Sequence, residues 1–134
     1  MRAGVAARPV SVARAKLPEV GSRECDGDHA RFELTVPATL AWFAGHFPGH
    51  SILPGVAQVG WAAHFAREAF GFAAEPLRID RVKFSNPVCP GDSLDLELRR
   101  ESASRDRVEW RFVRDGVAVS GGRLDFTAEP LQAA

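Results

Sequence analysis

The segment from Gly45 to Val56 gathers residue types that often carry out chemistry together. It contains His46, and histidine is the side chain best suited to move protons near neutral pH. Pro54 and Gly55 follow where a long apolar helical pattern begins. A glycine at a helix start leaves backbone N–H groups bare and pointing outward. A base close to such an anion-binding turn suits chemistry on a carbonyl or thioester.

The same segment resembles the active-site signature of a known family, the β-hydroxyacyl-acyl carrier protein dehydratases, which have the hotdog fold. The matching residues are His46-Phe47-Pro48-Gly49 and Leu53-Pro54-Gly55-Val56. The resemblance spans roughly Arg31 to Thr127 and continues at Arg81-Val82-Lys83-Phe84, Pro87-Val88 and Pro90-Gly91-Asp92. Within it, Gln58-Val59-Gly60-Trp61-Ala62 is most similar to a divergent subgroup of aryl-polyene-type pathways.

The resemblance implies an activity. That activity is dehydration of a 3-hydroxyacyl thioester, held by an acyl carrier protein, to the trans-2-enoyl thioester. In this family His46 would remove the proton alpha to the thioester, and the Gly55 N–H, aided by the helix dipole, would donate to the thioester carbonyl. Gln58 would either hydrogen-bond the substrate or cap a loop. The expected substrate-binding residues are Phe47, Pro54, Gly55, Val56, Gln58 and Gly60.

One position departs from the family pattern. Family members carry a Glu or Asp fourteen residues after the histidine, and that residue is Gly60 here. Gly60 either lets the helix pack close to a strand or opens the space where the acid stood. His64 lies one helical turn further on, on roughly the same face, and Glu68 lies one turn beyond it. His64 is therefore a candidate catalytic replacement for the acid, oriented by Glu68.

The missing acid leaves three functions open. The first is a dehydratase of fatty acid or aryl-polyene/polyketide-type biosynthesis, in which conjugation of the product lowers the barrier to loss of hydroxyl. The second is a subunit that binds acyl thioesters without turnover or supports a catalytic partner. A hotdog thioesterase ranks last, because such enzymes usually need a helix carboxylate to activate water and none stands at the right place.

Composition limits the partners of the chain. Of its 134 residues 46% are hydrophobic, and 17 basic residues balance 17 acidic ones, as in an ordinary globular protein. A net charge of zero argues against nucleic-acid binding through phosphate contacts. A cluster of arginines is either a solvated strand face or a landing patch for an acidic carrier protein. These arginines are Arg99, Arg100, Arg105, Arg107 and Arg111.

Other sequence features indicate the compartment and the assembly. No apolar run approaches the ~18 residues that span a bilayer, so no membrane segment is expected. Cys25 and Cys89 suggest neither a disulfide framework nor a metal site, which favours a reducing cytoplasm. No cofactor is expected. Apolar residues near the His46 loop, and the shared active sites of family dimers, predict a homodimer.

The hydrophobic pattern predicts an α+β protein in which an antiparallel sheet wraps one long central helix, as in the hotdog fold. It forms a single domain over residues 1–134, with residues 1–9 and 128–134 as frayed termini. The helix is predicted from Gly55 to Phe70, capped by Gly71 and buried on most faces because it is apolar nearly all round.

Period-two alternation predicts strands over residues 31–36, 78–85, 94–100, 107–114 and 117–127. Gly21 to Asp28 is polar and is predicted to be a loop. Asp115-Gly116 predicts a hairpin turn. Gly121-Gly122, inside the last strand, predicts a bulge or a close backbone approach.

Overall fold

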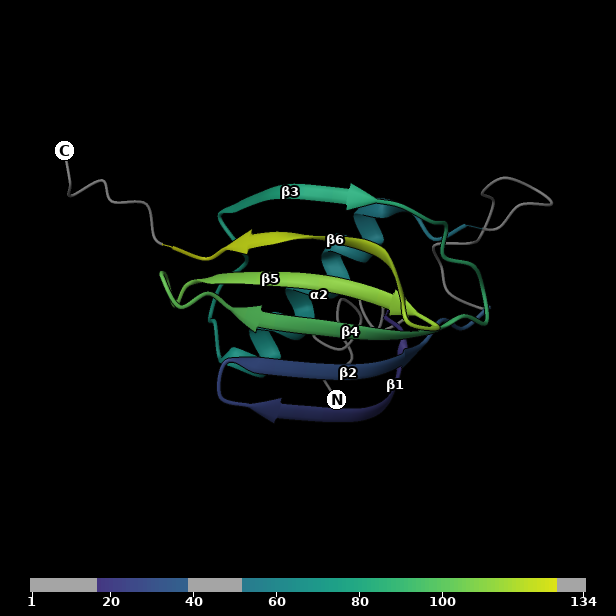
Figure 1. Cartoon of the computed structure of the whole chain (residues 1–134), viewed down its shortest axis with the longest axis horizontal. Helices are drawn as coiled ribbons and strands as arrows, with labels where there is room; N and C mark the ends of the chain where they lie inside the picture. The colour runs from purple at the N-terminus through teal and green to yellow at the C-terminus, as the bar shows by residue number, and fades with distance from the viewer. Residues whose placement is uncertain (1–16, 39–51, 128–134) are drawn as a thin grey trace, which may run out of the picture.

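A computed structural model describes residues 17–38 and 52–127 of the chain. In these ranges one helix packs on one face of a six-stranded antiparallel sheet (Figure 1), as the sequence predicts. The strand order is β1-β2-β4-β5-β6-β3, so β1 and β3 form the two edges of the sheet. The elements are β1 (Glu19–Asp26), β2 (His29–Thr35), α2 (Gly55–Phe70), β3 (Arg78–Phe84), β4 (Ser93–Arg100), β5 (Arg107–Arg114) and β6 (Val117–Asp125). The predicted frayed termini lie outside the described residues.

The predicted bounds of the helix are confirmed. Pro54 precedes α2 in an extended conformation, with φ −61° and ψ 149°. Gly71 ends it in the left-handed region, at φ 77°, where its N–H donates to the Arg67 carbonyl at 2.8 Å. Glycine adopts this conformation without the steric cost that a Cβ brings. No helix in the described ranges is long and apolar enough to cross a membrane.

Aromatic contacts join the helix to the sheet. The rings of Phe65 in α2 and Phe32 in β2 have centroids 4.8 Å apart, and those of Trp61 and Phe112 in β5 are 6.4 Å apart. Every second residue of β2, β4 and β5 is buried beneath α2, as the alternation predicts. The core therefore lies between one side of α2 and the middle of the sheet.

Two predictions about glycine positions in the last hairpin are confirmed. Asp115 and Gly116 both have positive φ, 52° and 79°, as a two-residue turn between antiparallel strands requires. A Cβ on Gly122 would lie 2.9 Å from the indole of Trp110, so only glycine fits beneath that ring. The close approach lets the bulky indole occupy the core.

The loop prediction for Gly21 to Asp28 is wrong, because most of this segment belongs to β1. Its residues are mainly exposed and polar, and so they carry no hydrophobic alternation. Antiparallel pairing of its backbone with β2 makes it a strand, with a register shift between Val20 and Ser22. An edge strand needs only one paired neighbour, which the local sequence does not reveal.

The prediction that α2 is buried on most faces is confirmed, because only Val56, Gly60, His64 and Glu68 of the helix are exposed. The sheet covers one side of the helix, while Val56 on the other side is 70% exposed. The apolar character of Val56 therefore does not serve the core of this chain. A large exposed apolar residue indicates a surface that something else covers.

Candidate functional site

The first turn of α2 has backbone donors that the helix itself does not use. The Pro54 carbonyl accepts from the N–H groups of Ala57 at 3.0 Å and Gln58 at 3.3 Å. The N–H groups of Gly55 and Val56 precede these bonds and have no helical partner. Among the described residues no side chain caps the helix, and its first turn holds no acidic residue. This turn can therefore receive a developing negative charge at the positive end of the helix dipole.

Buried contacts hold the chain in place just before this turn. Leu53 is 1% exposed, and its N–H donates to the Val88 carbonyl at 2.7 Å. The Gln58 side chain donates from Nε2 to the Leu53 carbonyl at 3.4 Å. Gln58 is itself buried, and its Oε1 has no hydrogen-bond partner among the described residues. The bond to Leu53 matches the interpretation of Gln58 as a residue that caps a loop.

The side of α2 away from the sheet forms an exposed stripe. We use this name for Val56, Gly60, His64 and Glu68, which recur at intervals of four residues and are all exposed. Among the described residues, no atom would lie within 4 Å of a Cβ on Gly60. Gly60 therefore does not serve close packing of α2 against a described strand. It leaves open space, which agrees with the interpretation that Gly60 opens the space where the acid stands in other family members.

His64 lies on the exposed stripe next to charged groups. Its Nε2 is 3.8 Å from Oε1 of Glu68, which also forms an ion pair with Arg23. Partial burial lowers the pKa of His64 below its usual value, and the positive charge of Arg67 lowers it further. The imidazole is thus mainly neutral near pH 7, and Glu68 is placed to orient it. A lowered pKa also makes the protonated form a stronger acid.

The predicted site residues fall into three groups. Pro54, Gly55 and Val56 form the start of α2, and Gly60 and His64 lie on the exposed stripe that continues from Val56. Gln58 lies instead on the buried side, facing the sheet. His46 and Phe47 lie outside the described residues.

Asp125 does not replace the missing acid, although it is the one buried carboxylate in the described chain. Burial by itself raises its pKa. Hydrogen bonds from Thr127 and Arg78, and the charge of Arg107, outweigh that effect and lower the pKa from 3.8 to about 2. A carboxyl group that is ionised near neutral pH cannot donate a proton. Among the described residues no three His, Cys, Asp or Glu side chains lie close enough together to hold a metal ion.

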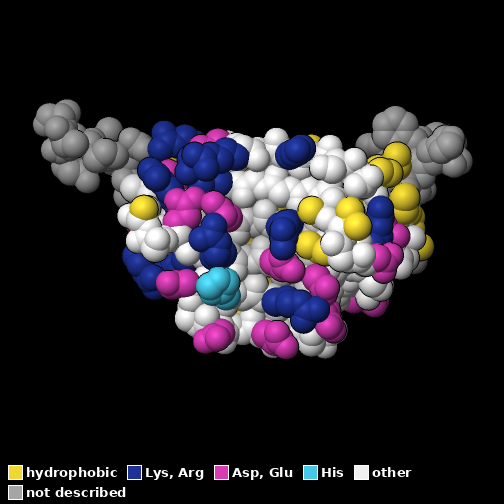
Figure 2. All heavy atoms as spheres, viewed as in Figure 1, with side chains coloured by type: hydrophobic (Ala, Val, Ile, Leu, Met, Phe, Trp, Pro, Cys, Tyr) yellow, Lys and Arg dark blue, Asp and Glu magenta, His cyan; other side chains and the backbone are white. Residues whose placement is uncertain are grey.

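The arginine cluster predicted from the sequence lies among carboxylates. Figure 2 shows basic and acidic side chains intermingled over the face of the sheet away from α2. The ion pairs are Arg99 with Glu109, Arg105 with Asp28, Arg107 with Asp125 and Arg111 with Glu97. Because these positive charges are locally balanced, the structure favours the interpretation as a solvated strand face.

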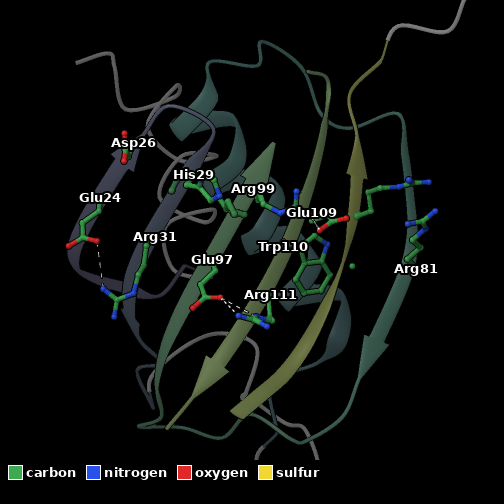
Figure 3. Close-up of a pocket in the computed structure, with 14 residues that line it drawn as sticks. Glu24, Asp26, His29, Arg31, Arg81, Glu97, Arg99, Glu109, Trp110 and Arg111 are labelled. Atoms are coloured by element: carbon green, nitrogen blue, oxygen red, sulfur yellow. Dashed lines mark hydrogen bonds and ion pairs between the residues drawn. The ribbon is translucent and has the colours of Figure 1, made fainter. Parts of the chain in front are cut away.

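The same face holds a cavity of about 700 Å³. Charged side chains from neighbouring strands line it, and several pair with one another across the strands (Figure 3). Glu24 lies 3.8 Å from Arg31, and Glu97 lies 2.6 Å from Arg111. This cavity is on the opposite side of the sheet from α2, so it is separate from the predicted site.

The sequence analysis did not include Phe84 in the site. Its ring, at the end of β3, lies against Gly55 at the start of α2, and the residue is 50% exposed. Phe84 ends a strand of mixed charged and apolar residues, and this sequence gave no sign that the strand would lie beside the helix start. Only the contact between β3 and α2 shows that Phe84 lies beside the helix start.

Comparison with known proteins identifies relatives. A family model described as ApeI-like, ApeI dehydratase, matches residues 22–123. The 3-hydroxyacyl-[acyl-carrier-protein] dehydratase FabZ of Legionella pneumophila (strain Corby) is 37% identical over 103 residues, which cover 69% of this chain and 66% of the relative. The chain thus spans slightly less than two thirds of that relative's length. FabZ of Roseiflexus castenholzii is 38% identical over 109 residues, covering 75% of this chain and 76% of the relative.

Solved structures agree with the sequence relatives. A chain of the dehydratase heterocomplex ApeI:P from Xenorhabdus doucetiae matches with a TM-score of 0.73 and 32% identity, over 81% of this chain and 96% of that one. The Escherichia coli PaaI protein matches with a TM-score of 0.59 and 18% identity, over 92% and 93% of the two chains, which supports the fold alone. Together these matches confirm the predicted hotdog fold. This chain belongs to the ApeI-like dehydratase family of hotdog proteins, homologous to the FabZ 3-hydroxyacyl-[acyl-carrier-protein] dehydratases.

Proposed function

We propose that this protein dehydrates a 3-hydroxyacyl thioester, carried by an acyl carrier protein, to the trans-2-enoyl thioester. The observation that carries the proposal is the uncapped first turn of α2, which presents the N–H groups of Gly55 and Val56. It follows directly the segment that holds His46. The names of the FabZ relatives support the substrate class, and the family model supports a role in aryl-polyene-type or fatty acid biosynthesis.

The chemistry is an elimination. His46 accepts the proton from C2, and negative charge develops on the thioester oxygen. The N–H of Gly55 donates to that oxygen, and the loss of one such donor can cost ~3 kcal/mol of transition-state stabilisation. The C2–C3 double bond forms as the C3–O bond breaks, and the leaving hydroxyl takes a proton and departs as water. The substrate contacts come from Phe47, Pro54, Gly55, Val56 and Gly60, while Gln58 holds the Leu53 carbonyl just before the helix start.

The departing hydroxyl needs a proton donor, because Gly60 offers no side chain. We assign this role to His64, which lies one turn from Gly60 on the exposed stripe. The space above Gly60 leaves room for a substrate hydroxyl or a water between the two positions. A product with an extended conjugated system lowers the barrier to elimination and so reduces the demand on this donor.

The active assembly is a homodimer with the two central helices in the middle. In the described sheet β3 is an edge strand that pairs with β6 alone, and its residues Ile79 and Val82 are 44% and 39% exposed. A second copy would cover these side chains and Val56. Light scattering at micromolar concentration should show twice the 14.5 kDa chain mass. A species of single-chain mass alone would contradict the dimer.

A second candidate function is a non-catalytic subunit that binds acyl thioesters or supports a catalytic partner. Two observations favour it: the absence of the helix acid at Gly60, and the solved heterocomplex of the ApeI relative. In this case the chain alone would bind an acyl carrier substrate without turnover. A thioesterase ranks third, because such an enzyme needs a carboxylate to activate water. Glu68 is the one carboxylate of the exposed stripe, and it pairs with Arg23.

A turnover assay tests the proposal. Native protein is incubated with 3-hydroxyacyl-carrier substrates that bear saturated, conjugated and aryl chains, and enoyl product is measured. His46→Ala should lower the rate by about 10²–10⁴-fold, the usual contribution of a general base, while the fold is retained. Full activity in a folded His46→Ala protein would remove His46 from the mechanism. Binding without native turnover would favour the supporting subunit.

A further inference from the structure

The ring of Phe84 lies against the first residue of α2. A Cβ built on Gly55 would be 2.6 Å from Cζ and 2.9 Å from Cε2 of this ring, closer than side chains normally approach. A Cβ on Gly60, in the same helix, would have no atom within 4 Å. The close contact therefore belongs to the turn whose N–H groups are bare.

The sheet fixes the position of this ring. Phe84 is the last residue of β3, and its backbone pairs with Ser120 in β6. The next residue, Ser85, donates its N–H to the Val119 carbonyl at 2.8 Å. A side chain carried by a hydrogen-bonded strand is placed more accurately than one on a loop. Phe84 can therefore serve as a fixed surface beside the helix start.

Packing within the chain does not explain why an aromatic residue stands here. Phe84 is 50% exposed and is neither part of the buried core nor one of the partly buried residues packed on it. Ile52 and Val56, which lie on either side of Gly55 in the sequence, are 38% and 70% exposed. An exposed apolar cluster next to polar donors indicates a binding surface for a molecule that is apolar at one end.

We propose that Phe84 forms the apolar wall against which the acyl carbons next to the thioester carbonyl pack, an inference that rests on the proposed function. With the carbonyl oxygen at the Gly55 N–H, the adjoining C2 and C3 lie beside the first turn of α2. The ring of Phe84 touches that turn. It holds these carbons by apolar contact and keeps water from the N–H groups, which strengthens their interaction with the oxyanion.

The test compares Phe84→Ala and Phe84→Leu with Val117→Ala, a matched control because Val117 is also exposed, at 58%, but lies in the β5–β6 hairpin. Two measurements are made: kcat and KM for the best 3-hydroxyacyl substrate, and the Kd of a 3-hydroxyacyl pantetheine amide, whose C2 protons are less acidic than those of a thioester, so that elimination is slow. Phe84→Ala should raise KM and Kd by about tenfold, as loss of apolar contact does in other hydrophobic sites. Phe84→Leu should recover part of the loss, and Val117→Ala should change neither value.

Two results would overturn the inference. One is an unchanged Kd in Phe84→Ala. The other is a raised Kd that accompanies a halved mass in light scattering, because the ring would then be a subunit contact. The amide measurement also separates this inference from the proposed function. If the native protein binds the amide but shows no turnover, the dehydratase proposal fails, and loss of binding in Phe84→Ala still supports the wall. If the native protein does not bind the amide, the wall is overturned.

Discussion

The two sides of α2 carry different kinds of residue. On the side facing the sheet, Trp61, Phe65 and four alanines are almost completely buried. On the other side, the exposed stripe carries a valine, a glycine, a histidine and a glutamate at intervals of one turn. Packing against the sheet accounts for the first set, since each side chain fills space in the core. Nothing in the fold of residues 17–38 and 52–127 accounts for the second.

Gly60 shows the difference most clearly. An exposed position inside a helix favours alanine or a long polar residue, and glycine costs about 1 kcal/mol relative to alanine. No neighbouring atom requires a glycine there, in contrast to Gly55, where the Phe84 ring leaves no room for a Cβ. The exposed stripe therefore departs from what folding favours. Such departures are expected at functional sites rather than in the core.

The largest expected effect is a loss of stability when a side chain on the sheet-facing side of α2 is truncated. Trp61→Ala should lower the free energy of unfolding by about 3–5 kcal/mol, because it leaves a cavity between α2 and β5. Val56→Ala, on the exposed side of the same helix, should change it by less than about 0.5 kcal/mol in the isolated chain. Urea denaturation of both variants measures the contrast. Equal losses would mean that the two sides of α2 are not distinct in stability.

The next effect concerns activity. Gly60→Glu places a carboxylate on the exposed stripe, where the neighbouring space is open. It should raise turnover of simple 3-hydroxyacyl thioesters by about a hundredfold, the lower range of general acid catalysis. Gly60→Gln is the matched control, of the same shape without the acid, and should show no gain. If both variants gain equally, or neither does, the absence of an acid at this position does not limit turnover of simple 3-hydroxyacyl thioesters.

His64→Ala should lower native turnover by about tenfold, roughly 1.4 kcal/mol in the barrier. Burial lowers the pKa of His64 from 6.5, so its protonated form is gained as pH falls through a value below 6.5 and is lost as pH rises through it. Turnover that depends on this proton donor should therefore decrease as pH rises through that value, and His64→Ala should lose this dependence. A pH–rate profile of both proteins tests this. Robust native turnover that His64→Ala leaves unchanged would point to water as the proton donor.

The smallest effect separates helix propensity from function. Gly60→Ala should raise the free energy of unfolding by about 1 kcal/mol, because alanine favours the helix and meets no neighbour. Turnover should stay within about twofold, since alanine supplies no proton donor. Denaturation and the standard assay check both outcomes. A loss of stability would show instead that a second copy packs into the gap at Gly60.

The local signals in the sequence predicted the helix well. Pro54 marks the start of the helix and Gly71 its end. Their backbone conformations depend on residue type more than on neighbouring residues. The same holds for the Asp115-Gly116 turn, whose positive φ values suit few residues. The family motif around Pro54 and Gly55 predicted the fold and placed the helix start at the site. His46, the central residue of that prediction, lies outside the described structure.

Long-range contacts decided the rest. The segment of β1 is a strand because its backbone pairs with β2, although its polar residues predict a loop. The apolar pattern of α2 could not show which side the sheet would cover, and so Gln58 turned out to be buried while Val56 is exposed. The contact of Phe84 with Gly55 joins residues from two elements and has no local signal. The sequence by itself thus determined where the helix and turns begin and end, because these depend on backbone preferences of single residues. Only the tertiary structure decided which side chains are left facing outward, because that depends on which surfaces meet.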